Sequence, residues 1–508
     1  MLRISNRMMY NNTLVNAFRN NQGLMKAQEE LASGKRINRP SDDPTGMMEV
    51  LGLRTSIGKS NQYLKVMNNA ESVLNSADST IGAVNDQLKT AKEVALQQAG
   101  GLANAATRIT AGVKIDNMIE QMIQYGNTRV GSKYIFAGQR SDQLAIDSLG
   151  KYTGSGADLK LEINEGLEIP ISVKASDFLT TDMNARLSTT AGATPVSSLN
   201  GGAGVTTGTF NITDRNGTTA TITLSSGDDI SDVISNINAA ATDVTATLSS
   251  NGMAITLTYD DSTNQPTTAL TVEDNAVSRS LGISGSWNNN TITGDDLDPA
   301  VTDNTLLADL YGGQGLTLNN IILTHDSASA TVTFSSETTV GEVRTTINAV
   351  ATTINADVQI DSAGRMLTID STSATSGTVS FAFDTGAGAT AELLGIGGGR
   401  NIIPVLQKLS AALKRDDQNG ILTAIGLLDS NMETASSVRG QVGSRANQVL
   451  STREAVDLSK YNSIRIKSLV EDADFLKSAS ELAMLQTAYQ ATLKSSASII
   501  QPSLLDFM

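Results

Sequence analysis

The sequence contains no cysteine and very few aromatic or histidine side chains. Its 508 residues include one histidine, one tryptophan and an aromatic fraction of only 4%. Without cysteine the chain can form no disulfide, no thiolate metal site and no thiol nucleophile. The single histidine, His325, also leaves no multi-histidine metal site. Hydrophobic cores must therefore consist mainly of Leu, Ile, Val, Met and Ala, within a hydrophobic content of 40%.

The chain also lacks a surplus of positive charge and any long apolar run. Its formal net charge of −15 argues against a nucleic-acid binder, which needs a basic face. No stretch approaches the roughly 18 apolar residues of a membrane span. Residues 1–7 lack the apolar run of a cleaved secretory signal. We therefore expect no nucleic-acid partner and no membrane insertion, and we expect any export to use a route without a cleaved signal.

Candidate motifs for catalysis, cofactors and metals do not withstand inspection. Gly58-Lys59-Ser60 resembles the end of a phosphate-binding loop, but Leu53 stands where that motif requires glycine. Asp295, Asp296, Asp298 and Asp303 could hold calcium, but their spacing is not that of an EF-hand. We favour a solvated acidic linker there and a surface position for His325. The sequence thus predicts no catalytic site, no cofactor and no metal, and the protein is not expected to be an enzyme.

Heptad-spaced apolar residues dominate both ends of the chain. Near the C-terminus, positions alternate by four and three residues at Phe475, Ala479, Leu482, Gln486, Tyr489, Leu493, Ser496 and Ile500. Such an a/d seam must be buried against another helix. The matching positions at the other end are Leu14, Phe18, Met25 and Ala32. We expect the two ends to pair with each other or with copies of themselves, which favours an assembly protein over an enzyme.

Further helices are predicted over 12–33, 44–98 and 104–131, and again over 404–416, 420–466 and 473–501. The second helix keeps its heptad register throughout, which is typical of a left-handed coiled coil or a bundle. Its start is marked by Asp43 and Pro44, a carboxylate N-cap followed by proline at the first helical position.

The middle of the chain is rich in Gly, Thr, Ser and Asp and contains an internal repeat. Alternation over 159–173 predicts a β-hairpin. The segments 220–226, 230–239 and 244–248 align with segments 110 positions further on, at 330–336, 340–349 and 354–358. Each copy carries an Ile-Asn dipeptide and ends in Leu-Gly-Ile. The repeat unit is predicted to be a strand hairpin, a short helix and a second strand hairpin.

The predicted fold is a multidomain α+β protein. An elongated helical coiled coil or bundle is built from both termini, with an inserted β-rich region that contains two tandem repeats. The expected domains are a terminal assembly domain (1–40 with 470–508), a long-helix bundle (41–140 with 400–469), a β-hairpin segment (141–199), repeat 1 (200–285), an acidic linker (286–311) and repeat 2 (312–399).

Several motifs at the two ends resemble the flagellar axial proteins, which form the flagellin-like superfamily. They are LRIS at 2–5, SGKRINRPSDDP at 33–44, NNA at 68–70, NTRVGSKYIFAG at 127–138, ASEL at 479–482, LQTAYQA at 485–491 and SLLDF at 503–507. Flagellins share the Ser-Gly-x-Arg-Ile-Asn and Asp-Asp pattern. The RPSDDP, YIFAG and SLLDF segments are more similar to the hook-filament junction proteins, the third hook-associated proteins.

The resemblance implies a structural component of the bacterial flagellum that joins hook to filament and templates flagellin assembly. Its implied partners are copies of itself, the first hook-associated protein on the hook side, flagellin on the filament side and a cytoplasmic export chaperone. It would leave the cell through the flagellar type III channel and lie outside it. Two alternatives stay open: a minor flagellin, and a flagellar protein whose repeats act as a surface adhesin.

These expectations name particular residues. The predicted subunit interface consists of Leu14, Phe18, Met25, Phe475, Leu482, Tyr489, Leu493 and Ile500. The predicted chaperone or partner contacts are Leu504, Leu505 and Phe507, and the predicted loop and helix start contains Arg36, Asn38, Asp42, Asp43 and Pro44. Because an exposed seam cannot be buried by one chain alone, we expect the ends of an isolated subunit to be partly disordered.

Overall fold

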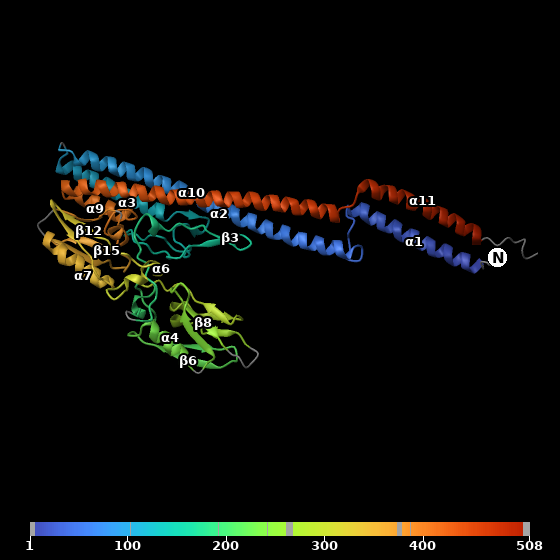
Figure 1. Cartoon of the computed structure of the whole chain (residues 1–508), viewed down its shortest axis with the longest axis horizontal. Helices are drawn as coiled ribbons and strands as arrows, with labels where there is room; N and C mark the ends of the chain where they lie inside the picture. The colour runs from blue at the N-terminus through green and yellow to red at the C-terminus, as the bar shows by residue number, and fades with distance from the viewer. Residues whose placement is uncertain are drawn as a thin grey trace, which may run out of the picture. The chain divides into compact units, whose positions relative to one another are not determined.

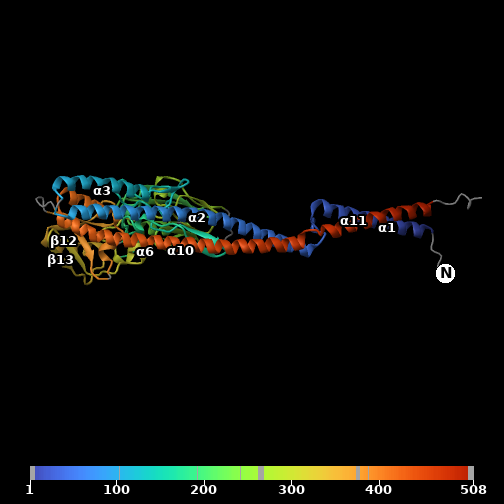
Figure 2. The ribbon, with the colours of Figure 1, turned by 90° about the horizontal axis from the view of Figure 1, so that it is seen from above.

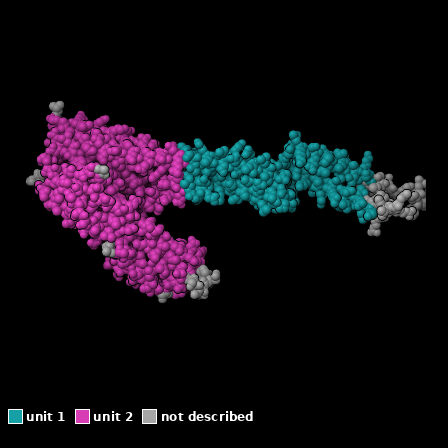
Figure 3. Space-filling view, in the orientation of Figure 1, with its two compact units in different colours: residues 1–69, 162–167, 449–508 teal, residues 70–161, 168–448 magenta. Residues whose placement is uncertain are grey.

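The computed structural model has two compact units (Figures 1 and 3). Unit 1 comprises residues 1–69, 162–167 and 449–508, and unit 2 comprises 70–161 and 168–448. The structure describes residues 6–101, 103–190, 193–240, 242–260, 268–372, 378–386 and 388–500. Long helices and several small antiparallel sheets make up these ranges, so the predicted α+β multidomain class is confirmed.

Unit 1 is mainly helical. It contains α1 (Asn6–Ser33), α11 (Phe475–Ile500), the first part of α2 (Pro44–Ala99) and the last part of α10 (Gln418–Glu471). Helices α1 and α11 lie side by side in both views (Figures 1 and 2). The predicted pairing of the two chain ends is therefore confirmed.

A β-hairpin also contributes to unit 1. Its strands are β3 (Lys160–Asn164) and β4 (Leu167–Pro170), as the alternating sequence predicted. The turn at 162–167 contacts α2, because Lys59 Nζ lies 3.3 Å from Glu165 Oε1 and the Tyr63 hydroxyl donates to Glu162 over 3.3 Å.

The helical part of unit 2 has an apolar core that follows the predicted heptads. Leu74, Ile81 and Leu88 of α2 are fully buried, as are Leu428 and Val442 of α10. Two shorter helices, α3 (Ala105–Gly126) and α9 (Ile402–Lys414), pack against each other.

Helix α3 ends five residues earlier than the sequence predicted. The side chain of Asn127 leaves the helix, since its Oδ1 accepts hydrogen bonds from the backbone N–H groups of Ala145 and Ile146 over 2.8 and 3.0 Å. The chain then continues into the short strands β1 (Arg129–Val130) and β2 (Lys133–Tyr134). The helix thus ends where the Asn127 side chain bonds to a distant backbone segment, and no further helical turn forms.

The two repeats have the predicted order of hairpin, helix and hairpin. Repeat 1 consists of β5 (Gly208–Thr213), β6 (Thr219–Leu224), α4 (Ile230–Asn238), β7 (Val244–Leu248) and β8 (Ile255–Tyr259). Repeat 2 consists of β12 (Ile321–His325), β13 (Ala328–Val332), α7 (Val340–Ala351), β14 (Ala356–Ile360) and β15 (Leu367–Ser371). Each repeat has its own apolar core.

The Ile-Asn dipeptide attaches each repeat helix to the following strand. Ile237 and Ile347 are fully buried. Asn238 Oδ1 accepts from the Ala246 N–H over 2.6 Å and its Nδ2 donates to the Ala246 carbonyl over 3.1 Å. Asn348 makes the same two bonds with Val358, at 2.6 and 2.8 Å. In each repeat, the side-chain amide of the asparagine therefore satisfies one backbone N–H and one backbone carbonyl in the first strand of the second hairpin.

These contacts correct one part of the repeat alignment. Asn238 bonds eight residues ahead and Asn348 bonds ten residues ahead. The equivalent of 244–248 is therefore 356–360, not 354–358. The 3₁₀ turn η4 (Thr352–Ile354), which follows α7 in repeat 2 only, accounts for the two additional residues.

The Leu-Gly-Ile ends of the repeats form similar turns after short helices, α5 (Ala276–Ser280) and α8 (Thr390–Leu393). Gly282 and Gly395 adopt left-handed φ angles of 66° and 87°. Glycine is favoured there because a Cβ would clash with the backbone.

The predicted acidic linker over 286–311 is wrong in its first half. Repeat 1 continues through β9 (Leu270–Val272), β10 (Gly285–Trp287) and β11 (Thr291–Thr293). These strands complete the sheets β10-β9-β5-β6 and β11-β8-β7, and Leu297 still belongs to the core of repeat 1. Apolar residues between the acidic ones are thus buried rather than solvated. The other domain boundaries stay predictions.

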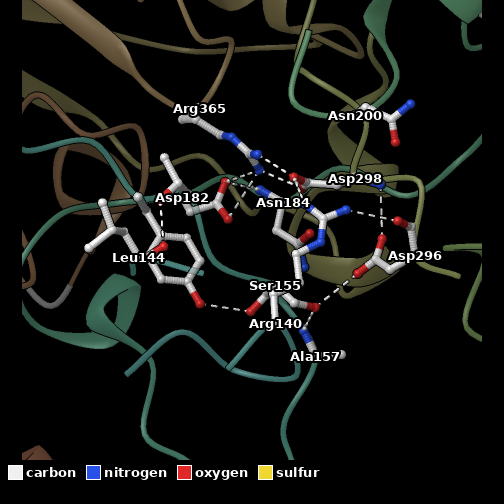
Figure 4. Close-up of polar contacts among 12 residues, drawn as sticks. Arg140, Leu144, Ser155, Ala157, Asp182, Asn184, Asn200, Asp296, Asp298 and Arg365 are labelled. Atoms are coloured by element: carbon white, nitrogen blue, oxygen red, sulfur yellow. Dashed lines mark hydrogen bonds and ion pairs between the residues drawn. The ribbon is translucent and has the colours of Figure 1, made fainter. Parts of the chain in front are cut away.

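Asp298 is also not solvated, whereas Asp295 and Asp303 are exposed. The Arg365 guanidinium donates to Asp298 Oδ1 over 2.6 Å and pairs with Asp182 at 3.4 Å (Figure 4). Arg140 lies 3.0 Å from Asp298 Oδ2 and donates to the Asp296 carbonyl over 2.9 Å. These contacts join repeat 2, the exit of repeat 1 and the segments around 140 and 182. Among the described residues, no cluster of acidic or histidine side chains could hold a metal ion.

His325 is buried, contrary to the predicted surface position. It ends β12, which pairs with β16 (Ser380–Asp384). Its Nδ1 lies 2.9 Å from the Ser380 hydroxyl and its Nε2 lies 2.9 Å from the Thr378 hydroxyl. Both ring nitrogens therefore have hydrogen-bond partners inside the protein.

Candidate functional site in the terminal helix pair

The seam between α1 and α11 is formed mainly by small and polar residues. Ala27 is buried in it, and a Cβ built on Gly23 would lie 3.3 Å from Leu485 Cδ1. Asn20 Nδ2 donates to the Thr492 hydroxyl over 2.9 Å. The Ser478 hydroxyl bonds to Glu30 over 3.2 Å. Short side chains allow the two helices to approach closely.

Most of the predicted apolar residues lie beside this seam rather than inside it. Phe18 and Met25 are each 62% exposed, and Phe475 is 67% exposed. Leu14 and Leu493 are exposed as well, whereas Leu482 and Tyr489 are partly buried. Within the single chain, the contact between α1 and α11 thus leaves most of the predicted apolar residues exposed. Their role as an interface between subunits stays a prediction.

Four of the predicted residues lie where no side-chain contact is described. The side chain of Ile500 falls outside the described side chains, and Leu504, Leu505 and Phe507 lie outside the described residues. Helix α11 covers one side of α1 within a single chain, and the expectation of partly disordered ends stays a prediction. Only the outward faces of the pair now require a partner.

Exposed apolar side chains are concentrated in unit 1. Of the 24 strongly exposed large hydrophobic residues in the described part of the chain, 18 belong to this unit, although it is the smaller of the two. Leu458 and Leu469 of α10 are 63% and 78% exposed. Contiguous apolar surface of this kind marks sites of protein–protein contact.

The loop between α1 and α2 has the predicted helix start. Asp43 Oδ1 accepts a hydrogen bond from the Gly46 N–H over 2.9 Å, and the helix begins at Pro44. Asp42 Oδ2 accepts from the N–H groups of Arg39 and Asn38 over 2.9 and 3.1 Å. These backbone hydrogen bonds hold the pKa of both aspartates below the usual range. The two carboxylates therefore organise the loop and the helix end.

The same loop is attached to the end of α10. The Arg36 N–H donates to the Glu471 carbonyl over 2.7 Å, and its Nη2 donates to the Val470 carbonyl over 2.8 Å. The Arg36 guanidinium also lies 3.4 Å from Asp43. Asn38 Nδ2 donates to the Lys35 carbonyl over 3.1 Å, within the loop. The predicted loop residues are thus brought together.

Sequence reasoning missed the acidic residue at this crossing. Only 1% of the Glu471 side chain is exposed, and it lies 2.7 Å from Lys35, 2.5 Å from Arg54 and 3.5 Å from Lys467. Burial opposes its ionisation, but hydrogen bonds and charges of Lys35 and Arg54 bring the pKa of Glu471 below its ordinary value. One signal was available: an acid at a helix C-terminus is unfavourable unless cations neutralise it.

Hydrogen bonds and ion pairs hold the helices of this site together. None of the described helices has an apolar segment long enough for a membrane crossing.

Two family models match the chain. Residues 4–141 match the bacterial flagellin N-terminal helical region, and residues 209–259 match the flagellin hook IN motif. The second match covers most of repeat 1 and includes the Ile237-Asn238 dipeptide.

Curated relatives of the chain are named as proteins of the flagellum. The chain is 25% identical to flagellar hook-associated protein 3 of Escherichia coli over 165 residues, which are 32% of this chain and 52% of the relative. The Salmonella typhimurium protein of that name gives 24% over the same shares. A flagellin of Clostridium tyrobutyricum is 24% identical over 35% of this chain and 45% of its own length. The chain spans about half the length of the curated relatives it matches.

Solved structures with similarity to the chain include two junction proteins. Flagellar hook associated protein-3 from Legionella pneumophila is 12% identical, with 82% of this chain and 98% of that chain covered and a TM-score of 0.36. FlgL from Xanthomonas campestris is 13% identical, with 82% and 97% covered and a TM-score of 0.34. The family models and curated relatives confirm the resemblance to the flagellin-like superfamily and its hook-filament junction proteins.

Proposed function

We propose that this chain is a structural subunit of the bacterial flagellum at the junction between hook and filament. The observation that carries the proposal is the terminal helix pair, whose outward faces expose large apolar residues such as Phe18, Met25 and Phe475. An exposed apolar surface of this kind on a folded chain marks a site that another molecule covers. The names of the curated relatives support the place of the subunit in the flagellum.

Assembly would be driven by the burial of these outward faces. Each Å² of apolar surface removed from water contributes about 25 cal/mol. Phe18, Met25, Phe475 and Leu493 would contact neighbouring copies, and head-to-tail contacts of one kind produce a ring or an open helical stack. The first hook-associated protein would adjoin this zone on the hook side. Flagellin would adjoin it on the filament side, where the subunits template its assembly.

The chain would reach this place through the flagellar type III channel, escorted by a cytoplasmic chaperone. The absence of cysteine is compatible with passage as an unfolded chain, since no disulfide has to be broken or formed. We assign chaperone contact to the apolar residues Leu504, Leu505 and Phe507.

The test is deletion of the gene, followed by complementation and labelling. We expect the deletion strain to lose its filaments while it keeps its hooks. Electron microscopy of complemented cells, labelled in repeat 1, should show one band next to the hook. Normal filaments still attached in the deletion strain would refute the proposal.

A second candidate function is that of a minor flagellin. It is favoured by the match to the flagellin N-terminal model and by a relative named flagellin. Label distributed along the filament, with many copies for each hook, would support this candidate against a junction subunit.

A third candidate is a surface adhesin carried by the repeats. The outward face of the β11-β8-β7 sheet carries two rows of three threonines, Thr245-Thr258-Thr291 and Thr247-Thr256-Thr293. Such a neutral, hydroxyl-rich face could bind a surface glycan. Deletion of 200–399 with unchanged surface attachment would remove this candidate.

A further inference from the structure

Two connections of the chain cross each other inside unit 1. One is the loop that leads from α1 to α2, and the other is the segment that leads from α10 to α11. Lys35 forms a β-bridge with Asp472, and the Ala473 N–H donates to the Gly34 carbonyl over 3.0 Å. The Arg36 N–H donates to the Glu471 carbonyl over 2.7 Å. The orientation of the terminal helix pair on α2 and α10 depends on this crossing.

The Glu471 side chain lies at the centre of the crossing. Its three cationic neighbours come from three different elements: Lys35 from the first connection, Arg54 from α2 and Lys467 from α10. One buried carboxylate thus holds together an incoming loop and two long helices. If the carboxylate were neutral, the three cations would repel one another and the buried group would lose its strongest contacts.

We propose that Glu471 is the positioning residue of the assembly surface, because its charge fixes the terminal helix pair in the orientation in which the pair meets neighbouring subunits. This inference rests on the proposed function for the meaning of that surface. The crossing itself is a property of the single chain, so it can be tested on purified protein regardless of the place of the protein in the cell.

The charge of Glu471 also makes the crossing sensitive to acid. Its pKa is lowered in the folded chain, so its stabilising effect is present above the ordinary glutamate value and is lost as the pH falls through the folded value. The other charged groups at the crossing are Lys35, Arg36, Arg54, Lys467, Asp43 and Asp472. Acid therefore removes the negative charge that the three cationic side chains surround.

The cysteine-free sequence allows a direct test. Spin labels are attached through Asp457→Cys on α10 and Ala483→Cys on α11, both exposed positions of unit 1. The distance between the labels is measured in the full chain by pulsed electron paramagnetic resonance. We expect one narrow distribution with Glu471 present and a broad one in Glu471→Gln, which keeps the shape and removes the charge. Glu481→Gln, an exposed glutamate of α11, is the matched control and should stay narrow.

Two readouts separate positioning from general stability. As the pH is lowered in steps below the ordinary glutamate pKa of about 4.3 and through the lower folded value, the parent distribution should broaden while that of Glu471→Gln changes little. Glu471→Asp, which retains the charge, should restore a narrow component at neutral pH. A narrow distribution in Glu471→Gln, or a broad one in the labelled parent at neutral pH, would overturn the proposal.

Assembly completes the test. Supplied to a deletion strain, Glu471→Gln should fail to keep filaments attached, whereas Glu120→Gln, at an exposed glutamate of α3 in unit 2, should restore them. Filaments attached normally by a Glu471→Gln chain with a broad distance distribution would overturn the positioning role. If the parent protein itself were absent from the junction, the proposed function would fail while the distance result at Glu471 would still stand.

Discussion

The two short helix pairs of this molecule are built in opposite ways. In unit 2, α3 and α9 bury large apolar side chains, and Ile115, Met122 and Leu409 are fully buried. In unit 1, α1 and α11 meet partly through short residues such as Asn20 and Gly23, and many of their large apolar residues stay exposed. A pair of the first kind is stabilised by its own core. A pair of the second kind gains most of its apolar burial only when another molecule covers it.

The same contrast occurs along single helices. The part of α10 in unit 2 buries Leu428 and Val442, whereas its part in unit 1 exposes Leu458 and Leu469. What differs is whether this chain supplies the partner surface. The predictions below test that difference, from the largest expected change in the free energy of unfolding to the smallest.

Arg365→Met should have the largest effect, because it breaks a buried charge network of unit 2. Asp182 and Asp298 would stay in the interior without their main cation, and burial already raises the pKa of Asp182. Removing one partner of a buried ion pair costs about 3–5 kcal/mol. Urea unfolding followed by the fluorescence of Trp287, the only tryptophan and a residue of unit 2, measures this loss. Arg279→Met removes an exposed ion pair with Asp274 and should change stability by less than about 1 kcal/mol.

Leu409→Ala should destabilise unit 2 by a similar or slightly smaller amount. The Leu409 side chain is fully buried on α9, so its truncation leaves a cavity next to α3. Leu→Ala changes in cores cost about 2–5 kcal/mol. The same urea experiment with Trp287 measures the change. A loss below about 1 kcal/mol would mean that this pair does not depend on its apolar core, and the contrast with unit 1 would fail.

Phe18→Ser should leave the free energy of unfolding nearly unchanged and abolish assembly. Phe18 is 62% exposed, and substitutions at exposed positions usually change stability by no more than about 0.5 kcal/mol. The assay is complementation of the deletion strain, with attached filaments as the readout and Leu422→Ser, an exposed residue of α10 in unit 2, as the control. Normal filament attachment by Phe18→Ser would mean that the outward face of α1 is not an interface.

Much of this architecture could be predicted because it depends on local pattern. Heptads identified the long helices, Asp43-Pro44 identified the start of α2, and the repeated Ile-Asn segments identified two modules with one fold. These features involve residues that are close in sequence or that recur at a fixed period.

The features that could not be predicted depend on contacts between distant residues. The close approach of α1 and α11 at Gly23 was not predicted, because glycine carries no apolar signal, although its lack of a side chain permits the contact. Asp298 was assigned to a solvated linker because its partner, Arg365, is 67 residues away. Glu471 was overlooked because Lys35 and Arg54 come from the other end of the chain. Composition does not reveal which charged residues have such partners.

The smallest effect is expected from Gly23→Ala, which tests how closely α1 and α11 approach. In a helix interior, alanine is favoured over glycine by about 1 kcal/mol. A Cβ at residue 23 would lie 3.3 Å from Leu485 Cδ1, so the leucine side chain would have to move by a few tenths of an ångström. We expect this strain to offset most of the gain, with a net change below about 0.5 kcal/mol.

The matched control is Gly440→Ala on α10, where a Cβ would have no neighbour within 4 Å. At residue 440 the higher helix propensity of alanine should therefore stabilise the protein by roughly 0.4–1 kcal/mol, with no strain to offset it. The change at residue 23 is measured by denaturant unfolding followed by circular dichroism at 222 nm, which reports on helices of both units. If Gly23→Ala stabilised the protein as much as Gly440→Ala, the α1–α11 seam would be loose rather than closely packed. Small residues would then be present in this seam for a reason other than close approach. The proposed contrast between the α1–α11 pair and the α3–α9 pair would lose its structural basis.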